Sequence, residues 1–240
     1  MPTTLPPGTD SFRTDDSGIL GDVIHFGPAL IALLAVAAGP LWQGTRHAVT
    51  LVHELGHAGV AVLTGRRLSG IRLHADTSGL TVSRGKPRGP GMVATAAAGH
   101  LAPSGVGLAL IGAVHARWAS EALWVALGLL AVTLVFIRNP FGLLVVAVAG
   151  AAVGATAYGA DALWQARLVE TAAWFWLLAS PRTVVELWLH RHRHRSGTTD
   201  ADILAHLTHL PAGVWNLLLL AITAAALWPA VDLLLAGLPD

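Results

Sequence analysis

The segment TLVHELGHAGVAVLTG, residues 50–65, places two histidines and one glutamate in a stretch whose other side chains are almost all apolar or small. The whole chain shares this bias, because 54% of its 240 residues are hydrophobic and only 12% are charged. In an ordinary soluble domain about a quarter of the residues are charged. The composition therefore predicts that lipid, and not water, surrounds most of the molecule.

Seven apolar segments approach the length of about 20 residues that a membrane-spanning helix needs. The breaks between them contain glycine, proline or charged residues. We therefore expect an all-α membrane protein with about seven transmembrane helices. Residues 24–240 would form a single multi-pass domain, and residues 1–23 a flexible tail. The segments are residues 24–42, 46–64, 91–115, 120–137, 141–158, 162–180 and 211–236.

Residues 68–84 do not follow a helical pattern. Ile71 and Leu73, and after them Leu80 and Val82, alternate with other residues around a turn at residues 76–79. Apolar residues at every second position on both sides of a turn are typical of a β-hairpin. We therefore expect a short hairpin directly after the helix that carries the two histidines.

The positive charges are distributed unevenly between the two sides of such a bundle. If the N-terminus is cytoplasmic and the segments alternate, twelve of the fifteen Lys and Arg residues fall on the cytoplasmic side, among them Arg182. Arg46, Arg117 and Arg167 fall on the opposite side. Cytoplasmic loops are enriched in Lys and Arg, so we expect a cell-membrane protein with a cytoplasmic N-terminus.

His53 and His57 are four residues apart, so a helix places both imidazoles on one face, where they can bind one metal ion. Glu54 is the next residue around the helix and can hold a water molecule without binding the metal. Zinc lowers the pKa of a bound water to about 7, and a nearby carboxylate can take its proton during attack on a peptide carbonyl. This spacing predicts a catalytic zinc site. The alternative is chance burial of three polar side chains, which would cost several kcal/mol at membrane depth.

The surroundings of these residues resemble the site-2-protease superfamily of intramembrane zinc metallopeptidases, and most closely its compact bacterial M50B-like branch. The similar blocks are HELGHAGVAVLTGRRLSGIRLHADTSGLT (53–81), AAAGHLAPSGVGL (96–108), RNPFG (138–142) and TTDADILAHLTHLPAGVW (198–215). The resemblance implies a zinc ion held by two His and one Asp, with Glu54 as the general base. Residues 68–84 could be an interfacial loop, or the edge strand of the hairpin could receive the substrate as an added extended strand, and the resemblance favours the second.

The third zinc ligand is less clear, because the LDG motif that supplies it in most of the superfamily is absent. Asp200 matches the resembled signature best and Asp202 is the weaker candidate, although either residue could simply cap a helix. His206 and His209 on the same segment are rival ligands. Asn139 could position the substrate, or it could cap a tight turn.

Five other histidines have no partner at ligand spacing, so we expect interfacial or structural roles for them: His25, His47, His74, His100 and His115. The predicted partners are a membrane-protein substrate and the lipid bilayer. The net charge of +1 gives no indication of nucleic acid binding. Two alternatives to a protease remain open: a non-proteolytic zinc-binding regulatory membrane protein, and a small transporter of protons or metal ions.

Overall fold

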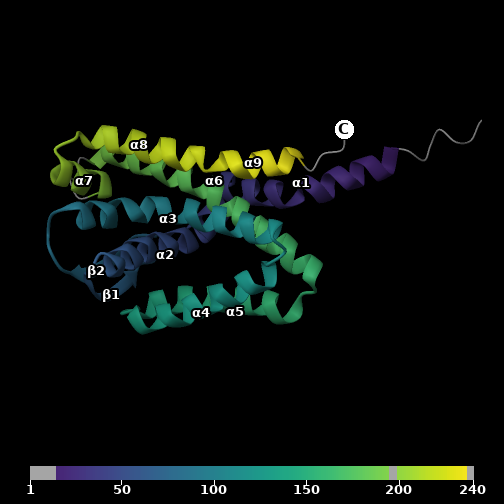
Figure 1. The fold of residues 1–240 in the computed structure, drawn as a ribbon, viewed down its shortest axis with the longest axis horizontal. Coiled ribbons are helices and arrows are strands. Elements are labelled where there is room, and N and C mark those ends of the chain that lie inside the picture. Colours follow the sequence, from purple (N-terminus) through teal and green to yellow (C-terminus); the bar gives the residue numbers. More distant parts are fainter. Residues whose placement is uncertain (1–14, 195–198, 237–240) are drawn as a thin grey trace, which may run out of the picture.

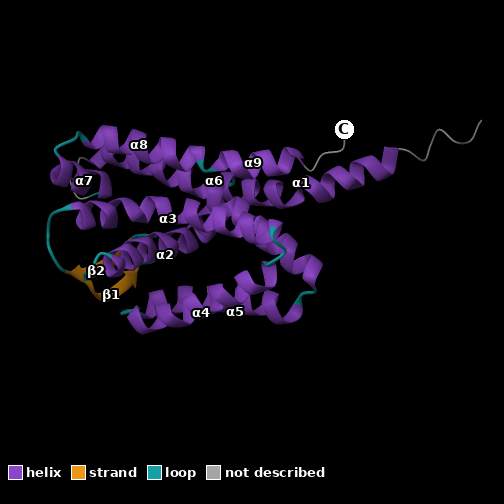
Figure 2. Ribbon diagram, in the orientation of Figure 1, coloured by secondary structure: helices purple, strands orange, loops and turns teal. Residues whose placement is uncertain are grey.

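The computed structural model describes residues 15–194 and 199–236, most of which are helical (Figures 1 and 2). The all-α membrane class with one short hairpin is confirmed. The elements are α1 (Asp15–Ala37), α2 (Gly39–Leu63), β1 (Arg67–Leu73), β2 (Gly79–Arg84), α3 (Pro90–His115), α4 (Ala119–Phe136), α5 (Pro140–Gly159), α6 (Ala162–His194), α7 (Asp200–Thr208), α8 (Ala212–Ala225) and α9 (Leu227–Ala236).

All seven predicted segments lie in helices, but fewer meet the length and hydropathy required to cross a membrane. Within the described ranges, four spans do so: α3, α4, α5 and the joined α8–α9. Helices α1 and α2 make a fifth if they are taken together, with a bend of 97° between them. The predicted segment 24–42 ran through this bend. Pro40 explains the break, because proline has no N–H to continue the ladder of α1 and its ring clashes with the preceding turn.

The boundaries at two further places differ from the prediction. Helix α1 begins at Asp15, inside the segment predicted as a tail, and residues 1–14 of that segment lie outside the described residues. Helix α6 does not stop at residue 180 but continues through Pro181 to His194, over 33 residues. At 1.5 Å per residue it is about 50 Å long. Arg182 is therefore part of a helix and not of a cytoplasmic loop.

This longer helix corrects part of the predicted charge distribution. Glu186 of α6 accepts a hydrogen bond from Arg182 Nε at 3.2 Å and pairs with Arg46 Nη2 of α2 at 3.3 Å. The indole of Trp42 donates to the same carboxylate at 2.7 Å. Two guanidinium groups that share one carboxylate cannot lie on opposite sides of a hydrocarbon core of about 30 Å. The placement of Arg46 and Arg182 on opposite sides of the membrane was wrong.

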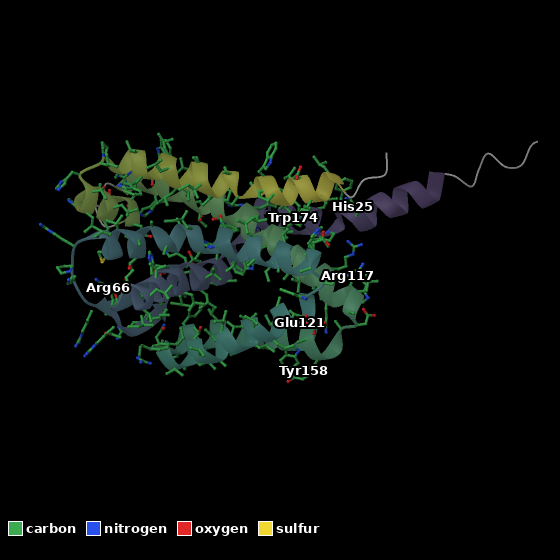
Figure 3. The ribbon with its side chains drawn as sticks, in the orientation of Figure 1. His25, Arg66, Arg117, Glu121, Tyr158 and Trp174 are labelled. Atoms are coloured by element: carbon green, nitrogen blue, oxygen red, sulfur yellow. The ribbon has the colours of Figure 1, made fainter. Side chains whose placement is uncertain are left out.

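The molecule has a hairpin end and an opposite end (Figure 1). The β-hairpin and α7 lie at one end, where α2 and α6 finish and α3, α5 and α8 begin. Figure 3 shows Arg66 at this end, whereas Arg117 and Glu121 lie toward the other. The loops that the sequence assigned to the cytoplasmic side after residue 65 thus come together at the hairpin end.

Helix α3 packs closely against α2 because both helices use small residues at their contact. A Cβ added at Gly56 of α2 would lie 2.5 Å from the Cβ of Ala102 and 2.6 Å from the carbonyl oxygen of Ala98, both on α3. Small residues at helix contacts let backbones approach in this way. On its other side, α3 packs against α6, where Gly107 meets Leu177 and Ala173. Helix α3 therefore forms the centre of the bundle.

The hairpin is antiparallel and uses one face to contact the bundle. Ile71 pairs with Thr81 and Leu73 with Gly79, and these residues share the face that carries the two buried β1 side chains. The first strand has a further neighbour, because Arg138 N donates to the carbonyl of Ile71 at 2.9 Å. In the described part of the chain, the outer edge of β2 pairs with no other strand.

Candidate metal centre

The two histidines of the HELGH segment lie side by side on α2, as their spacing predicts. Their Nε2 atoms are 3.0 Å apart. The Nδ1 atom of His57 lies 2.7 Å from the carbonyl oxygen of Thr95 on α3. A metal-binding histidine usually donates its second ring N–H to such a group, which fixes the ring orientation. The arrangement leaves the Nε2 atom of His57 directed toward the site.

Asp200 completes this group from the opposite end of the sequence. Its Oδ2 atom lies 3.2 Å from His53 Nε2 and 3.3 Å from His57 Nε2. Helix α7 begins at Asp200, with Thr199 as its N-cap. The structure thus brings together the three residues that were predicted as metal ligands.

Asp202, the weaker candidate, stabilises the start of α7 instead. Its carboxylate accepts from the Thr199 backbone and hydroxyl, and the Thr199 hydroxyl in turn accepts from the Asp202 backbone N–H, which forms a capping box. It also pairs with Arg191 of α6 at 2.8 Å. These contacts fasten α7 to α6 and so hold Asp200 in place. The helix-capping role considered for both aspartates belongs to Asp202.

The two aspartates also differ in what sets their ionisation. Burial alone would raise the pKa of Asp200, but hydrogen bonds from His53 and His57 hold it well below the usual range of a carboxyl. Burial likewise opposes ionisation of Asp202, whose pKa is lowered by Thr199 and Arg191. Both carboxylates are therefore charged at neutral pH, but only Asp200 presents its charge to the imidazoles.

His100 of α3 is a fourth member of the cluster, which corrects its assignment as an isolated histidine. Its Nε2 atom lies 3.5 Å from Asp200 Oδ2, and its ring centre lies 4.6 Å from that of His53. His53, His100 and Asp200 form a group whose ligand atoms all lie within 4.8 Å of one another. The one available signal was its position: His100 is an ionisable residue in an apolar, small-residue helix, where such residues are costly.

Gly99 explains how α3 can lie so close to the cluster. A Cβ at this position would be 2.4 Å from His57 Nε2 and 2.6 Å from His53 Cε1. Any larger residue would therefore displace the imidazoles. Gly99 therefore leaves the space that the two imidazoles occupy.

The donor atoms fit a zinc ion. Zinc–nitrogen and zinc–oxygen bonds are about 2.0–2.1 Å, and two donors of a tetrahedron with such bonds lie about 3.3 Å apart. The separations of 3.0, 3.2 and 3.3 Å among His53, His57 and Asp200 agree with this value. Two imidazoles and one carboxylate are also a ligand set of the kind that catalytic zinc sites use.

Glu54 follows His53 on α2, and the residue is only 4% exposed. Its carboxylate is not part of the metal-ligand group, by which we mean His53, His57, His100 and Asp200, but turns toward the hairpin, where the hydroxyl of Thr81 donates to its Oε2 atom at 2.6 Å. A Cβ at Gly79 would lie 2.4 Å from its Oε1 atom. Glu54 is thus held between the metal-ligand group and strand β2.

A cavity of about 740 Å³ opens beside the site. Residues of α2, the hairpin, α3, α6 and α7 line it. It is lined by His53, Glu54, His57, His100 and Asp200 together with the β2 residues Gly79, Leu80, Thr81 and Ser83. A cavity of this size can hold several residues of an extended peptide.

The other candidate residues lie elsewhere. Asn139 donates to the carbonyl of Leu73 at 2.6 Å and accepts from the Leu73 backbone N–H at 3.2 Å, so it holds the end of β1. It is not among the residues that line the cavity. His206 and His209 are exposed on and after α7 and do not belong to the metal-ligand group.

The fold and the site together define a multi-pass membrane protein with a candidate His/Asp metal centre beside a buried glutamate. A family model described as Peptidase M50B-like matches residues 27–230. The chain belongs to this family, which confirms the resemblance seen in the sequence, and it is a membrane metallopeptidase in that general sense. Neither a curated protein nor a solved structure matches the chain.

Proposed function

We propose that the chain is an intramembrane zinc metalloprotease that hydrolyses peptide bonds in or near transmembrane segments of membrane-protein substrates. The observation that carries this proposal is the carboxylate of Asp200 within 3.3 Å of both imidazoles of the HELGH helix. A structural metal site would have no use for the buried Glu54 carboxylate beside it. Family membership supports the same conclusion.

Each residue of the site would have a separate role in hydrolysis. His53, His57 and Asp200 would hold zinc. When bound, zinc would act as a Lewis acid, which lowers the pKa of water and polarises the scissile carbonyl. Glu54 is the general base: its carboxylate accepts a proton from the attacking water and returns it to the nitrogen of the departing amine. His100 contacts the Asp200 carboxylate and helps to orient it.

The hairpin offers a way to present the substrate. A helical peptide bond is shielded, so a transmembrane segment must be extended before its carbonyl can reach the site. The outer edge of β2 borders the cavity and has unpaired backbone groups, which an extended peptide can use to add a strand. Such addition would align the peptide along the row from Ser83 to Gly79, close to Glu54.

The site is at the hairpin end, which the excess of Lys and Arg assigns to the cytoplasmic side. We therefore place the protein in the cell membrane, with cleavage near the cytoplasmic face. Helix α1 starts toward the opposite end of the bundle, where His25 contacts the carbonyl of Leu234 (Figure 3). With the hairpin end in the cytoplasm, α1 would start on the non-cytoplasmic side, in place of the cytoplasmic N-terminus expected from the sequence. A protease at this position would suit regulated intramembrane proteolysis, in which the cytoplasmic part of a membrane protein is released.

The test is the substitution Glu54→Gln in the full chain, purified in detergent. We expect zinc content to stay at the wild-type level while cleavage falls by about 100- to 10,000-fold, which is the usual contribution of general base catalysis. Cleavage is followed by mass spectrometry on a library of apolar peptides of about 20 residues that carry central glycines, which favour extension. The matched control is Glu121→Gln, the same change at an exposed glutamate of α4.

The same measurements separate the alternatives. A variant Glu54→Gln with full activity would refute the base mechanism. Wild-type protein that binds zinc and cleaves no peptide of the library would favour a regulatory zinc-binding protein. Uptake of protons or metal ions into vesicles that depends on Glu54, without cleavage, would favour a transporter.

A further inference from the structure

We propose that Thr81 of strand β2 is a positioning residue for Glu54, so that the strand bordering the substrate cavity also orients the general base. This inference rests on the proposed proteolytic function and adds a residue to it. Its starting point is the hydrogen bond of 2.6 Å from the Thr81 hydroxyl to Glu54 Oε2. The same hydroxyl lies 3.0 Å from the backbone carbonyl of Glu54.

Two residues of β2 form the contact with Glu54 of α2. Gly79 and Thr81 are two residues apart and therefore share one face of β2. At Gly79 the strand comes so close that a Cβ would overlap the Glu54 carboxylate. The glycine thus admits the carboxylate, and the threonine two residues later binds it. Together they fix the direction of a side chain that has three rotatable bonds.

The position of Thr81 in the sheet is also unusual for a residue with a purely structural role. Its face of the hairpin carries Ile71 and Leu73, which are 1% and 2% exposed and pack in the apolar core. The cross-strand partner of Thr81 is Ile71. Thr81 is half-buried and lines the cavity. Packing against this apolar face would favour an apolar β-branched side chain, since a hydroxyl withdrawn from water needs a hydrogen-bond partner. The partner that Thr81 has is the proposed base.

The geometry has a consequence for catalysis. If Oε2 of Glu54 is held by Thr81, Oε1 is the oxygen left to handle the proton. A peptide that adds to the outer edge of β2 touches the same strand, so substrate binding and alignment of the base share one element. Loss of the Thr81 hydroxyl should then slow the chemical step and leave binding of both metal and peptide unchanged.

The experiment compares Thr81→Val, Thr81→Ala and Thr81→Ser in the full-length protein. Valine keeps the shape of threonine without the hydroxyl, alanine removes the hydroxyl with less bulk, and serine keeps the hydroxyl alone. Kinetics are measured on the best-cleaved peptide of the glycine-containing apolar library, and zinc content and the unfolding midpoint on the same samples. Thr156→Val on α5 is the control, because that hydroxyl bonds only within its own helix, to Ala152.

We expect kcat of Thr81→Val and Thr81→Ala to fall by about 10- to 100-fold, as for loss of a hydrogen bond to a charged group. KM and zinc content should remain within about twofold of the wild type. Thr81→Ser should restore most of kcat, and Thr156→Val should match the wild type. Valine and alanine serve as alternatives if one of them unfolds the hairpin.

Three outcomes would overturn the inference. Wild-type kcat in Thr81→Val would show that the hydroxyl is dispensable. Equal losses in Thr81→Val and Thr81→Ser would show that the hydroxyl does not restore activity, so its hydrogen bond to Glu54 would not explain the effect. A rise in KM or a loss of zinc with unchanged kcat would assign Thr81 to substrate or metal binding. A Glu54→Gln enzyme that remains active would instead refute the proposed function itself, so the two failures are distinguishable.

Discussion

The metal-centre region and the α4–α5 pair use the same small and polar residues in different ways. Helices α2, α3 and α7 and the hairpin surround the site, whereas α4 and α5 lie beside each other along one side of the bundle (Figure 1). Glycines near the site are crowded: Gly79 and Gly99 leave no room for a Cβ. Gly128 and Gly150 of the pair have no other atom within 4 Å of an added Cβ.

The hydroxyl groups show the same contrast. Thr133 and Thr156 of the α4–α5 pair donate to carbonyls four residues earlier in their own helices. Thr81 reaches from the hairpin to a carboxylate on α2. In lipid a hydroxyl must find some partner, and the nearest backbone carbonyl is the default choice. Polar contacts between different elements are therefore the better indicator of function in this molecule.

The largest expected effect comes from the two aspartates of α7. Asp200→Asn should lower zinc affinity by more than the about 10- to 100-fold that is lost when a ligand's hydrogen-bond partner is removed. Asp202→Asn weakens the capping box and the ion pair with Arg191, each worth about 1 kcal/mol or less, and should change the affinity less than tenfold. Zinc titrations against a competing chelator measure both, with Glu121→Gln of α4 as the neutral reference. Equal losses for both aspartates would mean that α7 acts only through its fold.

The second effect compares glycines of the two regions. In Gly99→Ala the new methyl group must push His53 and His57 apart, so zinc affinity should fall by at least about tenfold, which is a loss of about 1.4 kcal/mol. Gly128→Ala places its methyl group in open space and should leave zinc binding unchanged, with a small gain from higher helix propensity. If Gly99→Ala binds zinc normally, the tight contact between α3 and the imidazoles is not required.

Local sequence patterns were sufficient for one part of this site. The spacing of His53 and His57 predicts a shared helix face, and the period-two alternation predicts the hairpin, because both depend on residues close in the chain. Asp200 was found by its match to a family signature, since no local pattern connects it to α2. The sequence allowed either aspartate to be a ligand or a capping residue. The capping box in the structure assigns the capping role to Asp202.

The parts that were missed depend on packing between distant segments. His100 joins the cluster because Gly56 and Ala98 bring α2 and α3 together, and a single histidine has no sequence partner that reveals this contact. Helix α6 was cut short because Pro181 was taken as a helix end. The neighbouring spans and local side chains can satisfy a backbone interrupted by proline inside a membrane bundle. Next to Pro181, the Thr183 hydroxyl donates to the carbonyl of Ser180 within α6, and the Ser180 hydroxyl donates to the carbonyl of His100 on the neighbouring α3.

The smallest expected effect concerns Asn139, whose side chain forms two hydrogen bonds with the backbone of Leu73. Asn139→Ala should lower the free energy of unfolding by about 1–2 kcal/mol, at about 1 kcal/mol for each bond. Activity should fall only a few-fold, since the outer edge of β2 and Thr81 remain in place. Asn139→Asp should be worse than alanine, because a carboxylate oxygen would then face the carbonyl of Leu73. These changes are read from the unfolding midpoint and from kcat and KM on the apolar peptide. A large rise in KM without loss of stability would instead support the direct contact with substrate that the sequence suggested for this residue.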